Sequence, residues 1–362
     1  MISERILALA TCPRCLLAGA APPPLRVAAD RLGCPACGSS YTRTAEWLDL
    51  RPPANVAGRE THYTAEMATF AAALDYRAVG EPLLGAAVRL RWLRRWLPLR
   101  PGELALDLGA GDGRFALWNR DRGATIVALD AAPLFATAAR DTLDLVLGDV
   151  RVVPFPDATF DAVYSIDVME HLDAPGLERF FVEAARVLKP DGRFYLYSNT
   201  RERSTLWPVI TVWGWLSGLL RRRGVGDFAT DDLRKGDHVK VLATWRQVAA
   251  FAGYHGLRVE QARFWNGVFQ GLIDNVLIRL GEGALVQRKR RDKTAIVTAE
   301  APQEQASGLS ARQAISRRPA ARAALLALTG LMQLDIILFG RLRSGPFFAL
   351  LRKETAKDAG QQ

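Results

Sequence analysis

Residues 104–116, LALDLGAGDGRFA, decide the fold of this chain. An apolar run with the composition of a buried strand ends at Asp107, and a helix-like segment opens at Arg114. The turn between them holds three glycines, Gly109, Gly111 and Gly113. Because glycine lets backbone approach a ligand closely and a helix N-terminus offers unpaired N–H groups, this order predicts a nucleotide cradle. The spacing GxGxG differs from the GxGxxG of dinucleotide folds, which counts against NAD.

Strands and helices alternate after this turn, which predicts a parallel sheet. Five strands are expected, near 103–108, 124–130, 143–149, 159–167 and 192–198. Acidic residues stand at or near four strand ends, at Asp107, Asp130, Asp149 and Asp167. Ligands of open parallel sheets bind beyond the carboxyl ends of the strands. The spacing from Asp107 to Asp130 is typical of an acid that binds ribose hydroxyls, and Asp149 is placed for an adenine amino group.

In their order and spacing, these pieces resemble the class I S-adenosylmethionine-dependent methyltransferases, of the type 11-like kind. The matching stretches are LDLGAGDGRFA, VALDAAP, LGDVRVVPFPDATFDAVYSIDVMEHL and EAARVLKPDGRFYLYS. The resemblance implies an α/β, Rossmann-like sheet of seven strands whose last strand inserts antiparallel. It also implies S-adenosyl-L-methionine as the cofactor.

The same resemblance implies roles for single residues. Asp107 and the turn Gly109, Ala110, Gly111 and Gly113 would meet the methionine part, Asp130 the ribose, Asp149 and Val150 the adenine, and Ile166 would wall the cofactor. His171, just past the fourth strand, is the candidate catalytic base, with Glu170 second and His238 as a further candidate. The alternative is that the enzyme only orients the acceptor and that proximity drives the transfer.

The chain has four cysteines, Cys12, Cys15, Cys34 and Cys37. They form two CxxC knuckles, a spacing that predicts a tetrahedral zinc site. Four thiolates leave no position open for water, so the predicted zinc is structural. The alternative is four free or disulfide-paired cysteines. The start MISERILALA carries no signal-peptide pattern, so we expect a cytoplasmic, reducing setting.

Composition divides the chain into five parts. We expect a zinc-ribbon module at 1–52, a linker and helical cap at 53–100, and a methyltransferase core at 101–264 with an apolar insertion at 204–223. A helical insertion with a mobile linker at 287–320 is expected over 265–344, and the last strand at 345–353. Regular structure is expected to be lost over 204–220.

Two apolar segments are unusual for a soluble enzyme. Residues 204–220 hold three tryptophans and no charge, and three arginines follow directly. A hydrophobic helix is expected over 321–339, interrupted by Asp335. Tryptophans beside arginines are typical of a membrane interface. We therefore expect peripheral membrane contact through 204–223 and 321–343, with a lid over the acceptor site as the alternative that can coexist with it.

The acceptor of the methyl group is predicted to be a small or lipid-like molecule, because the motif text resembles the branch that methylates quinones and sterols. RNA is a second candidate. The cysteine ribbon resembles that of a bacterial ribosomal-RNA guanine methyltransferase family, and the net charge of +10 agrees with it. A [DN]PP[FY] signature is missing, since SIDVM stands there. The third alternative is a non-catalytic scaffold that recruits a partner through the ribbon.

Overall fold

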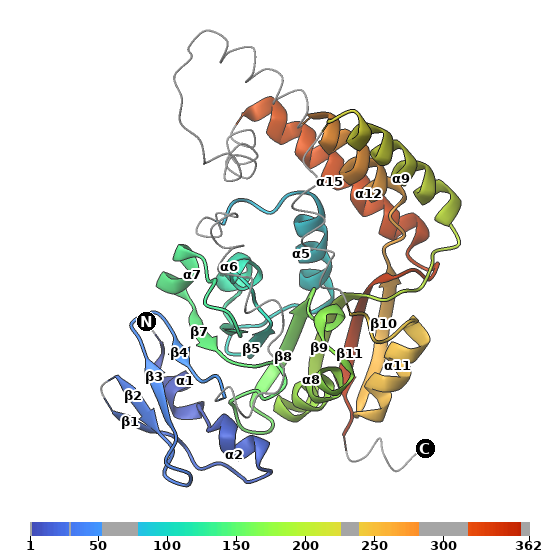
Figure 1. Ribbon diagram of the computed structural model, residues 1–362. Coiled ribbons are helices and arrows are strands. Elements are labelled where there is room, and N and C mark those ends of the chain that lie inside the picture. Colours follow the sequence, from blue (N-terminus) through green and yellow to red (C-terminus); the bar gives the residue numbers. More distant parts are fainter. Residues whose placement is uncertain (1, 29, 53–78, 226–238, 282–317, 356–362) are drawn as a thin grey trace.

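The computed structural model describes residues 2–28, 30–52, 79–225, 239–281 and 318–355 (Figure 1). A central mixed sheet contains seven strands in the order β7-β6-β5-β8-β9-β11-β10. Their bounds are β5 Leu104–Leu108, β6 Thr125–Asp130, β7 Asp144–Leu147, β8 Phe160–Ile166, β9 Leu188–Asn199, β10 Leu257–Phe264 and β11 Pro346–Lys353. The first five run parallel, so their carboxyl ends meet at one edge. The predicted Rossmann-like fold is confirmed.

The last strand of the chain lies inside the sheet. β11 pairs antiparallel with β9 on one side and with β10 on the other. Phe347 is opposite Ser198 of β9 and Phe264 of β10, and it is fully buried. This is the antiparallel last strand that the methyltransferase resemblance implied.

The cysteine-bearing segment extends the same sheet. Four short strands, β1 Arg26–Ala28, β2 Arg31–Gly33, β3 Ser40–Arg43 and β4 Leu48–Asp49, follow one another antiparallel. β4 then pairs parallel with β7, and the Leu50 N–H donates to the Leu147 carbonyl at 2.8 Å. With helices α1 (Glu4–Leu9) and α2 (Pro13–Leu17), the segment shares one continuous core with the central sheet. Eleven strands therefore form one sheet.

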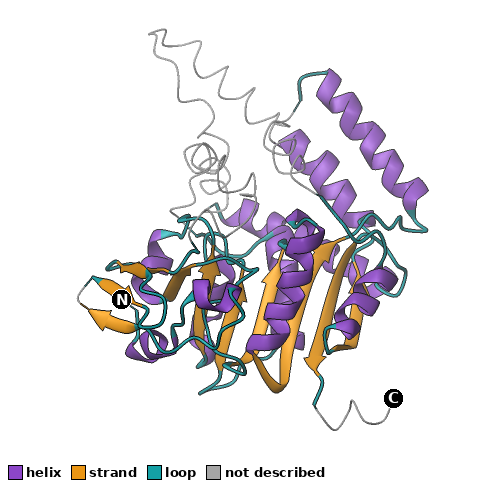
Figure 2. Ribbon diagram, turned by 60° about the horizontal axis from the view of Figure 1, so that its bottom comes forward, coloured by secondary structure: helices purple, strands orange, loops and turns teal. Residues whose placement is uncertain are grey.

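Helices cover both faces of the central strands (Figure 2). One face packs against α8 (Ala174–Val187) and α11 (Trp245–Tyr254), the other against α5 (Leu84–Trp96), α6 (Arg114–Asn119) and α7 (Thr137–Thr142). Side chains cap the N-termini of two of them. The Asp173 carboxylate accepts from the Gly176 N–H at 2.9 Å, and Thr244 forms a capping box with Gln247.

Three helices project from the carboxyl-end edge of the sheet as a layer that we call the helical arm (Figures 1 and 2). They are α9 (Trp207–Arg222), α12 (Val268–Leu272, continued by a π-helical turn at Ile273–Leu277) and α15 (Pro319–Phe339). The expectation that regular structure is lost over 204–220 is wrong. Pro208 stands in the first turn of α9, where no backbone donor is needed, and Gly214 and Gly218 each cost a helix only about 1 kcal/mol.

Asp335 does not interrupt α15. Its side chain is fully buried, and its two carboxylate oxygens accept the N–H groups of Phe269 and Gln270, at 2.9 and 2.8 Å. The acid therefore caps the first turn of α12 and ties the two helices together. Three earlier expectations lie outside the described residues: most of the linker at 53–78, His238, and the linker at 287–320 except for its last three residues.

Candidate active site

The glycine turn joins β5 to α6 at the carboxyl-end edge of the sheet. All three of its glycines have positive φ, between 57° and 84°. A Cβ on Gly109 would lie 2.3 Å from Cγ2 of Val168, so no larger residue fits there. A Cβ on Gly111 would have nothing within 4 Å. The turn thus leaves open space at Gly111, which is the room that a cofactor needs to approach the backbone.

Asp130, at the end of β6, is joined to this turn. One carboxylate oxygen accepts the Gly111 N–H at 2.7 Å and the other accepts the Ala132 N–H at 2.9 Å. Burial raises the pKa of Asp130, and the two backbone donors oppose that rise. Each oxygen keeps a further lone pair for a hydroxyl. The structure therefore brings together two of the predicted cofactor elements, the turn and the acid.

Asp107 lies below the turn at the end of β5 and is almost fully buried. Burial raises the pKa of its carboxyl well above the usual range, and the nearby Asp130 and Asp112 carboxylates raise it further. The Tyr164 hydroxyl beside it opposes this rise. One oxygen of Asp107 and the Tyr164 hydroxyl nevertheless lack a well-formed hydrogen bond to the described residues, which is costly for buried polar groups. A polar group of a bound cofactor would complete their pairing, so this site fits the predicted ligand.

The remaining predicted cofactor residues lie on neighbouring strand ends. Asp149 and Val150 follow β7, and Ile166 ends β8. The Gly148 N–H donates to the Asp130 carbonyl at 2.9 Å, which holds this loop beside β6. The Asp149 carboxylate pairs with Arg151 at 2.5 Å, a partner that was not predicted. An adenine amino group would share this carboxylate with Arg151.

The segment after β8 lies directly against the glycine turn. Val168 touches Gly109, and Asp167 before it has a left-handed backbone with φ of 58°, uncommon for a residue other than glycine. A short 3₁₀ helix, Met169–His171, follows. The structure therefore places Glu170 and the half-buried His171 two and three residues from the contact with the turn.

A polar cluster that the sequence did not predict adjoins this segment. Arg89 of α5 pairs with Asp167 at 2.9 Å, and its guanidinium lies 4.9 Å from the centre of the Tyr197 ring. The Ser198 hydroxyl donates to Glu170 at 2.5 Å. Tyr197 and Ser198 end a predicted strand, so the strand-end rule offered a signal for them. The sequence offered no such signal for Arg89, because only the packing of α5 brings this residue next to Asp167.

The Glu170 carboxyl is 2% exposed. Burial raises its pKa from the ordinary 4.5 to about 8, and the charge of Asp167 adds to the rise. The folded chain therefore holds this proton at a pH where the unfolded chain has lost it, so the free energy of unfolding falls as pH rises from about 4.5 to about 8. We expect Glu170→Gln to reduce this fall and to unfold at a higher temperature than the native chain at pH 8.

Thermal unfolding of both chains at several pH values measures the effect. The difference between the two chains isolates Glu170, because Asp107 and Asp130 contribute equally to both. A difference in unfolding temperature that stays constant between pH 5 and pH 8 would contradict the assignment.

The four cysteine sulfurs meet at one point. All four lie within 4.8 Å of one another, with Cys12 to Cys37 at 3.5 Å and Cys15 to Cys34 at 3.7 Å. Four sulfurs around a tetrahedral zinc, each at about 2.3 Å from the ion, are about 3.8 Å apart. Hydrogen bonding with Ser39 lowers the pKa of Cys37 to about 6, which favours a thiolate there, whereas burial raises the pKa of Cys12 and of Cys15. The cluster thus fits the predicted metal.

Contacts also connect the ribbon to the cofactor side of the sheet. Trp47, just before β4, packs on Phe135 with ring centroids 6.3 Å apart, and the Arg140 guanidinium lies over the indole at 5.1 Å. Phe135 belongs to the loop that follows Asp130. The Thr11 N–H donates to the Pro154 carbonyl at 3.0 Å, in the loop after Asp149. The loops after β6 and β7 therefore both contact the cysteine-bearing segment.

Parts of the chain are similar to known methyltransferases. Residues 106–196 match the family model described as a methyltransferase domain. The chain is 37% identical over 125 residues to a malonyl-[acyl-carrier protein] O-methyltransferase of Serratia marcescens, a match covering 34% of this chain and 44% of that protein. It is also 37% identical over 116 residues to a sterol 24-C-methyltransferase of Gibberella zeae, covering 29% and 30%.

Among solved structures, phosphoethanolamine N-methyltransferase 2 of Haemonchus contortus in complex with S-adenosyl-L-methionine matches with a TM-score of 0.44 and 16% identity. That match covers 82% of this chain and 59% of that one. The chain spans less than half the length of the two curated relatives that it matches. Residues 106–196 thus match a methyltransferase domain, and the seven central strands with their antiparallel β11 and the glycine turn agree with the class I fold that the resemblance implied.

Proposed function

We propose that the protein transfers a methyl group from S-adenosylmethionine to a small-molecule or lipid-like acceptor. The contact between Val168 and Gly109 carries this proposal, because it puts the residues after β8 beside the turn that would hold the methyl donor. The O-methyltransferase and the sterol methyltransferase to which the chain is similar support this class of acceptor.

In the mechanism, the chain mainly orients the two reactants. The bound cofactor supplies an electrophilic methyl group on a sulfonium. Asp130 would hold the ribose hydroxyls, Asp107 the methionine end, and Asp149, Val150 and Ile166 the adenine side. The segment Asp167–His171 would hold the acceptor in line and remove its proton. In this assignment His171 is the base, and Glu170, which is buried and bonded to Ser198, holds the segment in place.

Replacing His171 by alanine should lower kcat about 100-fold while the Kd for S-adenosylmethionine is unchanged, because a positioned base contributes at least that much. His255→Ala is the matched control, since this histidine packs on Phe181 and Phe251, on the face covered by α8 and α11. Steady-state rates and calorimetric titration give the two quantities. An unchanged kcat would show that proximity alone drives the transfer.

We also propose a role for the cysteine cluster and for the two apolar segments. The cysteine cluster would hold a structural zinc, and 204–223 and 321–343 would contact a membrane surface from the cytoplasmic side. The two segments lie on the carboxyl-end edge of the sheet, because β9 leads into α9 and α15 leads into β11. A lipid-like acceptor would then reach the site from the surface to which the protein is bound.

A methyl-radiolabel assay on fractionated cell extract tests the acceptor. Label in the lipid or small-metabolite fraction supports the proposal. Label in RNA, or none in any fraction from a chain that binds S-adenosylmethionine, would overturn it. The Asp130→Ala chain, which should bind the cofactor about 100-fold more weakly, is the control for each fraction.

A further inference from the structure

We propose that one face of α15 docks on an anionic lipid bilayer, with the helix lying in the plane of the membrane interface rather than crossing it. This inference deepens the proposed function. It rests on that function only for the idea that a lipid-like acceptor reaches the active site from the membrane. We call this surface the outward face of α15. Its exposed positions are Ala323, Leu326, Ala327, Gly330, Leu334, Ile337 and Leu338.

The outward face is wholly apolar along the helix. Its positions recur every three or four residues, which places them on one side. The exposed fractions of Ile337 and Leu338 are 65% and 59%, and Leu326 and Leu334 are also exposed. Soluble proteins seldom leave four large apolar side chains exposed on one helix face, so this face indicates a partner.

The opposite side of α15 is fixed to the protein. Met332, Asp335 and Ile336 are buried there. The Thr329 hydroxyl accepts the Leu84 N–H of α5 at 2.8 Å, and Arg322 pairs with Glu81 at 2.7 Å. The helix therefore has one side packed on the protein and one side that no other described residue covers. The lid and the membrane contact can then use different residues of α15.

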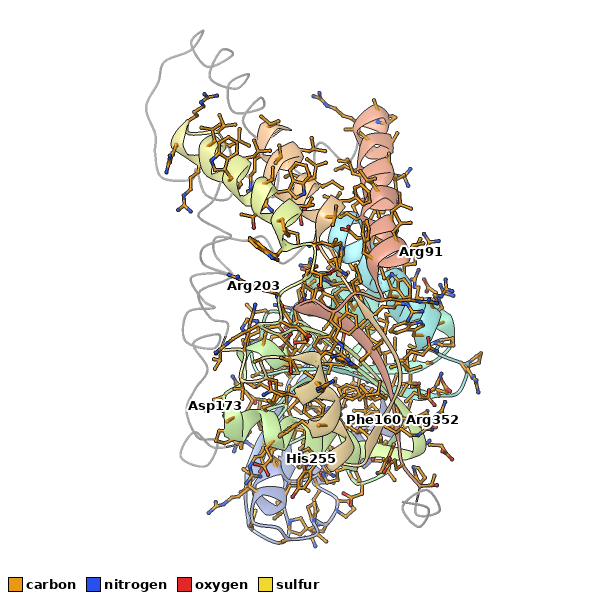
Figure 3. All side chains as sticks on the ribbon, turned by 90° about the vertical axis from the view of Figure 1, so that its right-hand side faces the viewer. Arg91, Phe160, Asp173, Arg203, His255 and Arg352 are labelled. Atoms are coloured by element: carbon orange, nitrogen blue, oxygen red, sulfur yellow. The ribbon has the colours of Figure 1, made fainter. Side chains whose placement is uncertain are left out.

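Among the described residues, α15 is the one helix long and apolar enough to cross a membrane. Its neighbour argues against a crossing. α5 packs beside α15 and exposes Arg91 and Arg95, and Figure 3 shows Arg91 close to the sheet-proximal end of α15. Charged side chains are costly in the hydrocarbon core. A helix lying in the interface keeps α5 in water and immerses only the outward face.

Arginines at both ends of α15 favour a bilayer over a second copy of the chain. Arg318 precedes the helix, and Arg341 and Arg343 follow it, all exposed. Two such faces packed together, parallel or antiparallel, would bring arginine against arginine. Anionic headgroups would instead pair with both ends, each basic residue near such a surface contributing attraction.

The α9 helix of the same arm has a matching composition. Trp207 and Trp215 are exposed, the latter at 67%, and no residue of α9 is buried. Arg221, Arg222 and Arg223 stand exposed at its C-terminal end. Tryptophan at the level of the headgroups and arginine beside them are the residues that interfacial helices use. Alongside α15, α9 therefore carries the residue types of an interfacial helix.

Flotation of the full chain with vesicles tests the docking. The native chain should float with phosphatidylcholine vesicles containing phosphatidylglycerol, less with pure phosphatidylcholine, and less at high salt. The double variant Ile337→Ser, Leu338→Ser should reduce the bound fraction at least about tenfold, because two large side chains leave the lipid. Val182→Ser is the matched control, since Val182 is an exposed apolar residue of α8, outside the arm.

Two results would overturn the docking. One is equal flotation of the native chain and the double variant. The other is a native chain that does not float. If that chain is a dimer by light scattering and the double variant is a monomer, a second copy covers the face instead. Flotation needs neither cofactor nor acceptor. Its failure therefore leaves methyl transfer untouched, and a chain that floats but labels no acceptor fails only the proposed function.

Discussion

Replacing Asp130 by alanine should raise the Kd for S-adenosylmethionine about 100-fold or more. The carboxylate holds the Gly111 and Ala132 N–H groups and, in our assignment, the two ribose hydroxyls. A hydrogen bond to a charged group is worth about 1.5–3 kcal/mol, so losing the two bonds to the ribose alone accounts for this change. Isothermal titration with the cofactor and with S-adenosylhomocysteine measures it.

Asp141→Ala is the control for this experiment, because Asp141 is an exposed acid of α7. Its Kd should equal that of the native chain. The unfolding temperature of both variants should be measured as well, since Asp130 also orders the turn. A native-like Kd in Asp130→Ala would move the ribose site away from β6.

Removing the predicted zinc should destabilise the whole domain and not only the ribbon. The four cysteines hold a segment that shares its sheet and its core with the central strands. Structural zinc contributes many kcal/mol to small folds, and losing even a few should lower the unfolding temperature by about 10 °C or more. We expect one zinc per chain by elemental analysis and a lower unfolding temperature after chelation.

Returning zinc to the chelated protein should restore the unfolding temperature, whereas magnesium should not, because thiolates select soft metals. Cys15→Ser should behave like the chelated protein, since Cys15 is buried within the cluster. A native chain that carries no zinc and whose unfolding temperature does not respond to chelator would contradict the zinc site. The four cysteines would then be thiols without a metal. Removing the zinc should also weaken the binding of S-adenosylmethionine, because Trp47 and Thr11 contact the loops after β6 and β7. Thermal unfolding with and without the cofactor measures this change.

The sequence allowed the central fold to be predicted because local pattern and global topology agree there. Asp107, Asp130 and Asp149 follow apolar runs, and parallel strands bring their ends to one edge. The number of strands and the antiparallel β11 came from the family resemblance rather than from the residues, and the order of the strands was not predicted. The assigned roles of these acids stay predictions, since geometry shows only that they surround the turn.

What could not be predicted depends on contacts between distant segments. β4 is two residues long, and nothing in Leu48 or Asp49 announces a pairing with β7. Arg89 reaches Asp167 only through the packing of α5. Asp335, an acid in an otherwise apolar helix, caps α12 by accepting the N–H groups of Phe269 and Gln270, which lie 66 and 65 residues earlier in the chain. Such partners leave no periodic signal.

The inserted β11 has a consequence for how the protein is made. It is the last described strand of the chain, and it separates β9 from β10 in the finished sheet. Until the ribosome has released residues 346–353, β9 has no neighbour on that side and β10 has no place to pair. Domains of this size fold through intermediates with unpaired edges. We therefore expect the nascent protein to depend on chaperones until β11 is complete, and a stop codon shortly before Pro346 to yield an aggregating product.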